Sequence, residues 1–282
     1  MGCMIEIHRP DGIARMRRAG VVAAETLVAI GARLGPGVRA SEVDCWVREY
    51  TTRVGGRPSQ LGYGGFPASV CVSPNDVVCH GVPHERVVLK NGDIVNVDVT
   101  TEIDGYHGDC SATFAIGELS PEAAHLVAAA RACREAGIAV VSPRARLGDI
   151  GAAIAETARR LGVSVVDHYG GHGIGRRMHM DPHVSHVGVR GAGQRLRAGM
   201  TFTIEPMVNL GRADTRVDAD GWTVRTADGS LSAQFEHTIL VTDTGAEILT
   251  CTSEPARAAS SPSDIVMRCE GPQSSSHASR SR

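Results

Sequence analysis

The sequence has few aromatic residues and no long apolar run. Phe, Trp and Tyr make up 4% of its 282 residues, which argues against an aromatic platform for stacking single-stranded nucleic acid. No stretch approaches the roughly 18 apolar residues that a membrane-spanning helix needs, so we expect no transmembrane segment. The N-terminus has no basic region followed by an apolar run, so no signal peptide is predicted.

Strong net charge and regular cysteine spacing are also absent. The formal net charge of −2 provides no overall basic field for nucleic acid or a membrane surface. The 8 cysteines contain no CxxC pair, which argues against a disulfide framework or a zinc ribbon and fits a reducing compartment. With 42% apolar and 21% charged residues, the composition is that of a soluble globular protein. We therefore expect a cytoplasmic protein without a DNA or membrane partner.

The residue pattern predicts helices and strands that do not alternate regularly. Helical periodicity and start signals predict helices at 11–34, 41–54, 120–141 and 147–161. Alternating or β-branched runs predict strands at 69–72, 77–79, 94–103, 106–116, 163–166, 201–210, 222–226, 232–242 and 247–249. The absence of steady βαβ units indicates the α+β class. The repeated order of two helices followed by strands suggests two related halves.

The composition changes near the C-terminus. From residue 252 onward Ser, Pro, Arg and Ala prevail and apolar residues are scarce. Such a segment cannot bury enough apolar surface to offset the entropy lost on folding. We therefore predict one folded domain over residues 1–251 and a disordered tail over residues 252–282.

The segment DVTTEIDGYHGD predicts a β-hairpin with two carboxylates on one face. Asp104-Gly105 is a favoured two-residue hairpin turn. If it turns there, Asp109 lies opposite Thr100, two positions along from Asp98. The two aspartates then project from the same side as diagonal neighbours, about 7–8 Å apart at Cα, and can converge on one ion. The polar face of an exposed hairpin would explain this pair equally well.

Three further residues that could bind a metal lie in distinctive sequence contexts: His172 in GGHGIG, Glu205 in TIEPM and Glu236 in QFEHTIL. An ionised carboxylate inside an apolar strand costs several kcal/mol unless a cation compensates it. The bases nearest in sequence, Arg225 and Lys90, are too few for four acids, whereas two divalent ions would supply the charge. Four carboxylates and one imidazole suit manganese, iron(II), cobalt or zinc. Paired ions about 3.5–4 Å apart with water between them perform hydrolysis.

Five motifs occur in a fixed order along the chain: VCHGVP, the two spaced aspartates, GGHGIG followed by Met178-His179, TIEPM, and SAQFEHTILVT. With this order and spacing, the chain resembles the type I methionine aminopeptidases, bacterial-style peptidases of family M24. The resemblance covers about residues 10–250. It implies the pita-bread fold, with two pseudo-symmetric halves whose antiparallel sheets are covered by helices.

The resemblance implies that two divalent metal ions (cobalt, manganese, iron(II) or zinc) are bound by Asp98, Asp109, His172, Glu205 and Glu236. Asp109 and Glu236 would bridge the two ions. Glu205 would also act as general acid and base. His80 would shuttle protons and position the amino end of the substrate, and His179 would contact the scissile peptide group and its developing oxyanion. The other histidines are interpreted as structural.

The resemblance also implies an apolar pocket for the methionine side chain, with walls formed by Tyr63, Phe66, Cys71, Met178 and Trp222. The chain departs from the commonest family pattern at three positions. Gln60 replaces a frequent Cys, Phe66 a frequent Tyr and Met178 a frequent Phe, which leaves the shape of the pocket open. A monovalent cation would lie near Asn75, Val77 and Ser232.

The implied activity is removal of the N-terminal methionine from nascent proteins and peptides with a small second residue. A water or hydroxide bridging the metals would attack the first peptide bond. The resemblance implies a monomer, with the ribosome as a candidate partner. Two alternatives remain open: a catalytically inactive binding module on the same fold, and a proline-specific aminopeptidase or dipeptidase. The intact set of ligands argues against the first alternative.

Overall fold

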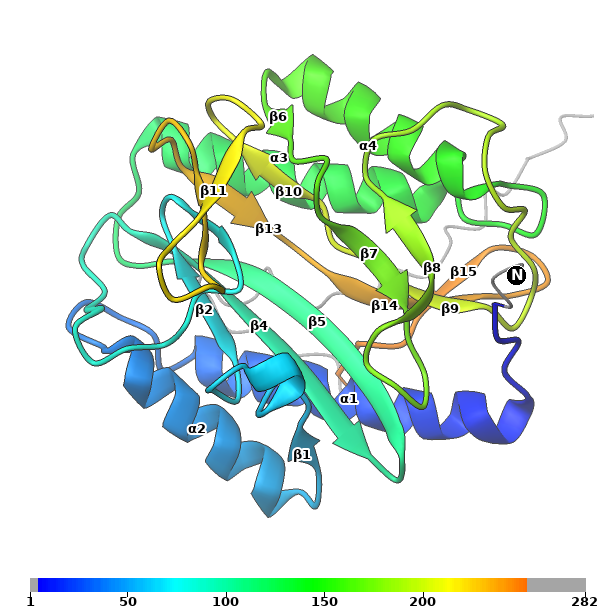
Figure 1. Cartoon of the computed structure of the whole chain (residues 1–282), viewed down its shortest axis with the longest axis horizontal. Helices are drawn as coiled ribbons and strands as arrows, with labels where there is room; N and C mark the ends of the chain where they lie inside the picture. Colours follow the sequence, from blue (N-terminus) through cyan, green and yellow to red (C-terminus); the bar gives the residue numbers. More distant parts are fainter. Residues whose placement is uncertain (1–4, 253–282) are drawn as a thin grey trace, which may run out of the picture.

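The computed structural model describes residues 5–252 of the chain. The predicted disordered tail, apart from Thr252, therefore lies outside the described residues. Within the described part, helices and antiparallel strands form two halves, with helix pairs on the outside and the strands between them (Figure 1). The predicted α+β class is confirmed.

The described residues form four α-helices: α1 (Pro10–Gly31), α2 (Ala40–Arg53), α3 (Pro121–Ala139) and α4 (Leu147–Leu161). Their bounds lie close to those predicted from periodicity, and α4 matches fully. Sequence signals explain two of the ends. Ser120 accepts the backbone N–H of Ala123 at 3.2 Å and so caps α3, and Gly162 ends α4 in the left-handed conformation, with φ +70°.

The first half is built on a long hairpin of β4 (Ile94–Ile103) and β5 (Tyr106–Ala115). β1 (Arg57–Pro58) and β2 (Cys71–Pro74) pair with β4, and α1 packs across both hairpin strands. A short 3₁₀ turn, η1 (Tyr63–Gly65), lies between β1 and β2. The turn at Asp104-Gly105 places Asp109 opposite Thr100. The predicted hairpin and its register are therefore confirmed.

The second half contains a five-stranded antiparallel sheet in the order β15-β14-β9-β7-β8. The bounds of these strands are β15 (Ala246–Ile248), β14 (His237–Val241), β9 (Thr201–Ile204), β7 (Gly170–Gly173) and β8 (Met180–Ser185). Helices α3 and α4 pack against each other on the outside of this half (Figure 1). Neither β7 nor β8 was predicted from the sequence.

Two three-stranded sheets connect the halves. One has the order β13-β10-β6 and consists of β13 (Ser232–Gln234), β10 (Met207–Asn209) and β6 (Ser164–Val165). The other has the order β11-β12-β3 and consists of β11 (Thr215–Val217), β12 (Val224–Thr226) and β3 (Val77–Cys79). β11 was also missed by the sequence pattern.

The predictions of unbroken strands at 201–210 and 232–242 are wrong. The first breaks into β9 and β10, since Pro206 has no backbone N–H to donate, and the second breaks into β13 and β14. Ile204 pairs with His237 before the break and Met207 with Gln234 after it. The two broken strands therefore run side by side, and Glu205 and Glu236 stand opposite each other in the gap.

The described cysteines are mostly free thiols: Cys45, Cys71, Cys79, Cys110 and Cys133. This agrees with the expectation that no disulfide framework holds the fold. Cys251 is an exception, because it is disulfide-bonded. Within residues 5–252, no helix is both long and apolar enough to cross a membrane.

Candidate metal centre

One cavity of about 240 Å³ lies between the two halves, and all five predicted metal ligands line it: Asp98, Asp109, His172, Glu205 and Glu236. β4 and β5 each contribute an aspartate from the first half, and β7 contributes the histidine from the second. The two glutamates come from the paired strand breaks. The register of the hairpin and the breaks in the two strands therefore determine which carboxylates meet.

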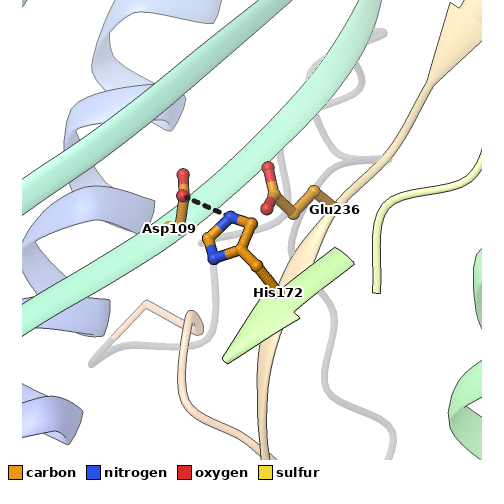
Figure 2. Close-up of side chains that lie close together, drawn as sticks. All are labelled: Asp109, His172 and Glu236. Carbon is orange, nitrogen blue, oxygen red and sulfur yellow. Dashed lines mark ion pairs between the residues drawn. The ribbon is translucent and has the colours of Figure 1, made fainter. Parts of the chain in front are cut away.

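Asp109, His172 and Glu236 bring their donor atoms close enough together to hold one metal ion (Figure 2). One ligand atom from each residue lies within 4.8 Å of the other two. The Nε2 atom of His172 lies 3.7 Å from Oδ2 of Asp109 and 3.6 Å from Oε1 of Glu205. Asp109 and Glu236 are only 4% and 1% exposed. This spacing lets a single cation contact carboxylates and the imidazole together.

Protein cations do not neutralise these acids. In the part of the chain that the structure describes, the cavity carboxylates have no ion pair with Lys or Arg. Arg225 instead pairs with Asp76 at 2.7 Å and with Asp218 at 2.6 Å. Lys90, the other base near in sequence, is exposed. The negative charge therefore has to be balanced by protons or by bound metal.

The carboxyl pKa values reflect this missing counter-charge. Burial raises the pKa of Asp98 to about 7 and that of Glu205 to about 8. Burial, and then repulsion from the neighbouring carboxylates, raises the pKa values of Asp109 and Glu236 well above their usual range. Burial lowers the pKa of His172 to about 3, so its imidazole is neutral and offers a lone pair. Divalent cations can displace the protons that this cluster otherwise retains.

The donor set fits divalent metal ions. Carboxylate oxygens with one imidazole nitrogen are hard-to-borderline ligands. Nδ1 of His172 lies 3.1 Å from the carbonyl oxygen of Gly173, which directs Nε2 toward the carboxylates. Thr100 Oγ1 donates to Asp109 at 2.8 Å, and Thr203 Oγ1 donates to Glu205 at 2.6 Å. These contacts hold the donors in place before any ion binds.

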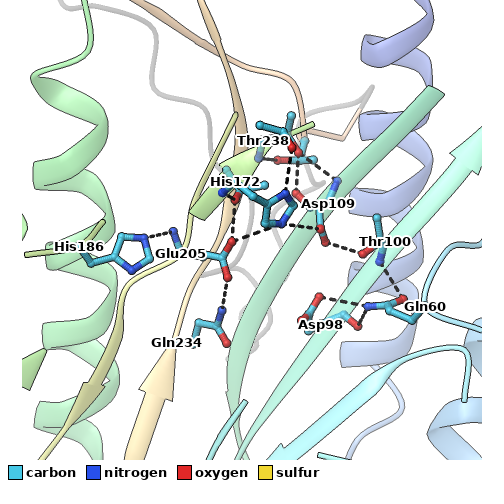
Figure 3. A network of polar contacts seen from close by, with 12 residues as sticks. Gln60, Asp98, Thr100, Asp109, His172, His186, Glu205, Gln234 and Thr238 are labelled. Atoms are coloured by element: carbon cyan, nitrogen blue, oxygen red, sulfur yellow. Dashed lines mark hydrogen bonds and ion pairs between the residues drawn. The ribbon is translucent and has the colours of Figure 1, made fainter. Parts of the chain in front are cut away.

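Several supporting residues were not singled out as such from the sequence (Figure 3). Gln60, noted only as a departure from the family pattern, donates through Nε2 to the backbone carbonyl of Asp98 at 2.8 Å and accepts from the N–H of Thr100 at 3.2 Å. Gln234 donates to Glu205 at 3.3 Å. Thr100 and Gln234 each lie two positions from a predicted ligand. Residues two positions apart on a strand face the same side, and this spacing could have identified both residues from the sequence.

His80 and His179 also line the cavity. His80 has φ +54°, a left-handed backbone that costs energy in a residue other than Gly and is common at functional sites. The ring of His179 lies 4.1 Å from that of His172 and 4.9 Å from that of Tyr63, between centroids. Burial lowers the pKa of His80 and lowers that of His179 to about 4, so both are neutral near pH 7.

The residues predicted to contact the methionine side chain line the apolar part of the same cavity: Tyr63, Phe66, Cys71, Met178 and Trp222. The rings of Phe66 and Trp222 meet edge to face with centroids 5.3 Å apart. Cys71 and Met178 are buried. The structure thus brings the predicted ligands and the predicted pocket residues to one place. Their individual roles stay predictions.

The residues predicted near a monovalent cation do not line this cavity. The backbone N–H of Ser232 donates to the carbonyl oxygen of Asn75 at 2.9 Å, and Val77 lies two residues further along the chain. The hydroxyl of Ser232 is buried without a hydrogen-bond partner. An oxygen left unsatisfied in this way is compatible with a cation at this place, which stays a prediction.

A buried carboxylate–imidazole centre between two halves of helix-covered antiparallel sheet defines a metal-dependent hydrolase of the pita-bread class. Residues 14–243 match the model of metallopeptidase family M24. Methionine aminopeptidase A of Synechocystis is 48% identical over 250 residues, which cover 89% of this chain and 99% of that protein. Methionine aminopeptidase of Escherichia coli K12 is 47% identical over 247 residues, which cover 87% and 94%.

The crystal structure of methionine aminopeptidase from Rickettsia prowazekii superposes with a TM-score of 0.86 at 46% identity, covering 88% of this chain and 100% of that one. The chain therefore belongs to metallopeptidase family M24. The predicted family resemblance, the pita-bread fold and the assignment as a metal-dependent hydrolase are confirmed.

His186, interpreted from the sequence as structural, contacts the backbone of Glu205 (Figure 3). It is fully buried, and its Nε2 accepts the backbone N–H of Glu205 at 3.2 Å. β9 ends at Ile204, so this N–H donates to the imidazole instead of to a neighbouring strand. His186 therefore fixes the backbone that carries Glu205.

We expect His186→Leu to weaken binding of Mn²⁺ about tenfold, because a buried N–H without an acceptor costs roughly 1–3 kcal/mol and lets Glu205 move. His186→Gln, whose side-chain oxygen can replace Nε2, should retain most of the affinity. Titration calorimetry with Mn²⁺ measures both variants, and thermal unfolding of the metal-free proteins gives their stability. Equal affinity losses in the two variants would contradict this positioning role.

Proposed function

We propose that this protein removes the N-terminal methionine from polypeptides whose second residue is small. The observation that supports this most strongly is that the five candidate ligands and an apolar wall line the same cavity. The high identity to methionine aminopeptidases along nearly their full length supports the same substrate.

The cavity suits a chain end better than an internal peptide segment. The methionine side chain would lie against Phe66, Met178 and Trp222, which are apolar and partly or fully buried. The free α-amino group would lie near His80 and the carboxylates on the opposite side. Tyr63 is exposed, and His179, whose ring lies against Tyr63 and His172, still reaches the solvent at one edge. Both mark the outer part of the cavity, where the second residue would lie. A large second side chain would collide with this part of the cavity.

Two divalent ions held by the five ligands would polarise the first carbonyl and lower the pKa of water between them. Glu205 takes up the proton of the attacking water and passes it to the departing amine. Neutral His179 donates an N–H to the oxygen of the peptide group as negative charge develops there. His80 accepts and returns protons at the amino end.

We also propose a cytoplasmic monomer that acts on nascent chains, with the ribosome as a candidate partner. The five free thiols of the described residues support a reducing compartment, whereas the disulfide of Cys251 does not. Cobalt, manganese, iron(II) and zinc all suit the donor set. Metal content and activity, measured together on protein reconstituted anaerobically with each ion, identify the ion and the number required.

Hydrolysis of a Met-Ala-Ser peptide tests the proposal. We expect turnover after reconstitution with Mn²⁺ or Co²⁺ and none after chelation. Glu205→Gln should lower kcat by about a hundredfold or more, the usual contribution of a general acid–base group. Glu118→Gln, which changes an exposed glutamate away from the cavity, is the matched control and should leave kcat unchanged.

The same assay separates the alternative functions. Faster release of the first residue from a peptide with Pro in second position and no Met would show a proline-specific enzyme. Absence of turnover with every divalent ion, in protein that binds those ions, would show an inactive binding module. Turnover that is unaffected by Glu205→Gln would contradict the proposed proton transfer.

A further inference from the structure

Two segments outside the cavity bring arginines face to face. Arg146, the residue that precedes α4, and Arg195, in the segment between β8 and β9, form an isolated antiparallel bridge. The residues that flank this pair exchange backbone hydrogen bonds of 2.9 and 3.0 Å, while the paired arginines exchange none. This is the narrow type of antiparallel pair, in which opposite side chains come closest.

Buried and exposed residues alternate along both segments, so the arginine side chains all lie on the outer face. Ala145 and Leu196 are 9% and 1% exposed and join the hydrophobic core. Their neighbours are exposed on the surface: Arg144, Arg146, Arg195 and Arg197. We call these four residues the arginine ladder.

The ladder has little compensating negative charge. Within the described residues, none of the four ladder guanidiniums makes an ion pair. The nearby acid Glu156 pairs instead with Arg190, which is not part of the ladder. The carboxylate of Asp149 lies beside the ladder and attracts Arg146, while its oxygens accept the backbone N–H groups of Arg146 and Gly191, at 2.7 and 2.6 Å. This single carboxylate faces four arginines. Like charges directly opposite each other on paired strands destabilise the fold. The ladder therefore carries a cost that an anionic ligand would remove.

The two central guanidiniums are held in place by backbone carbonyls. Nη1 of Arg146 donates to the carbonyl oxygen of Gly193 at 2.8 Å, and Nε of Arg195 donates to that of Pro143 at 3.1 Å. Each bond crosses from one segment to the other and uses one N–H, so further N–H groups of each guanidinium face solvent. Because these side chains are already held in place, a ligand that binds there loses less free energy to ordering them.

We propose that the arginine ladder binds the phosphodiester backbone of a nucleic acid strand, with Arg146 and Arg195 contacting phosphate oxygens. The planar guanidinium matches phosphate geometry with paired hydrogen bonds. Arg144 and Arg197 extend the positive surface on either side, which suits a repeating anion. A lipid surface fits less well, since only Val187 and Val189 are large exposed apolar residues in the same segment. With a net charge of −2, the attraction is local and sensitive to salt.

The test compares Arg146→Gln/Arg195→Gln with Arg86→Gln/Arg159→Gln. The control removes the same charge from two exposed arginines that have no ion pair in the described part of the chain. Fluorescence anisotropy measures binding of single-stranded RNA and single-stranded DNA oligonucleotides over a series of salt concentrations. Each lost phosphate contact should reduce the slope of log K against log salt by about 0.7 for a single strand.

We expect the ladder variant to lose at least about tenfold in affinity at low salt and about 1.4 in slope, from two contacts. The control should stay within twofold of the unaltered protein. The RNA and DNA arms identify which strand is preferred. Because the ladder lies outside the cavity, hydrolysis of Met-Ala-Ser should be unchanged in both variants, so a failure of the proposed function is recognised separately.

No binding of either strand by the unaltered protein, equal affinity in ladder and control variants, or binding of anionic phosphatidylserine vesicles but not of oligonucleotides would each overturn the proposal.

Discussion

Asp109→Asn should lower peptidase activity by at least about a thousandfold and at the same time stabilise the metal-free protein near pH 8. Asp109 is 4% exposed and faces the other cavity carboxylates without a Lys or Arg partner in the described residues. Metal ions contribute several kcal/mol to such reactions, and 1.4 kcal/mol is about tenfold in rate. Asparagine cannot ionise and keeps the size of the side chain, so the variant avoids the cost of holding Asp109 protonated, or charged among other carboxylates, in the folded state. The same change removes the metal ligand.

Thermal unfolding with and without Mn²⁺ measures both effects. A gain of about 1 kcal/mol in the free energy of unfolding would raise Tm by roughly 2–4 °C in a domain of this size. Saturation at about 100 times Kd should add roughly 2.7 kcal/mol to the unaltered protein and much less to the variant.

The control is Asp228→Asn. This fully exposed carboxylate accepts the backbone N–H of Arg212 at 2.7 Å and that of Ser230 at 3.0 Å, and these bonds lower its pKa to about 2. Its substitution should lower Tm slightly and leave the response to metal intact. A lower Tm for metal-free Asp109→Asn, or full activity in it, would contradict an uncompensated carboxylate cluster.

The metal-free protein should lose stability as pH rises from about 6.5 to 8, and bound metal should remove or reverse this trend. A carboxyl whose pKa is raised on folding contributes stability at low pH that is lost as pH rises from the unfolded pKa through the folded one. Asp98, at about 7, and Glu205, at about 8, titrate in this window. Each carboxyl still protonated in the folded state and ionised in the unfolded state lowers the free energy of unfolding by about 1.4 kcal/mol per pH unit.

Histidines set the lower limit of this window. Burial lowers the pKa of His172 to about 3 and that of His186 to about 3, so these groups remove stability as pH falls below about 6.5, where the unfolded chain takes up protons. Denaturant unfolding at several pH values, with a chelator or with Mn²⁺, measures the slopes. A flat or rising metal-free profile between pH 6.5 and 8 would show that the four carboxyls do not retain protons.

The pairing register of the β4–β5 hairpin could be predicted because it is determined by a local turn. Asp104-Gly105 adopts positive φ at both positions, +52° and +76°, and this turn determines every pairing back to Ile94. The helices were equally predictable, since their caps and periodicity lie within a few residues. Glu205 and Glu236 were identified as candidate ligands because an apolar strand tolerates an ionised carboxylate only with a compensating cation, and His172 was identified by its GGHGIG context.

Sequence by itself therefore determined the fold class, the hairpin that carries two aspartates, and the list of candidate ligands. Only the tertiary structure decided which groups meet. The breaks that place Glu205 opposite Glu236 depend on pairing between two distant strands. The contact of His186 with the backbone of Glu205 depends on where the chain runs after β8 and where β9 ends. The bridge between Arg146 and Arg195 is non-local as well. Local sequence patterns indicate which chemical groups a residue offers. The electrostatic cost of a buried side chain and its role in a site depend on neighbours that are brought together only by folding.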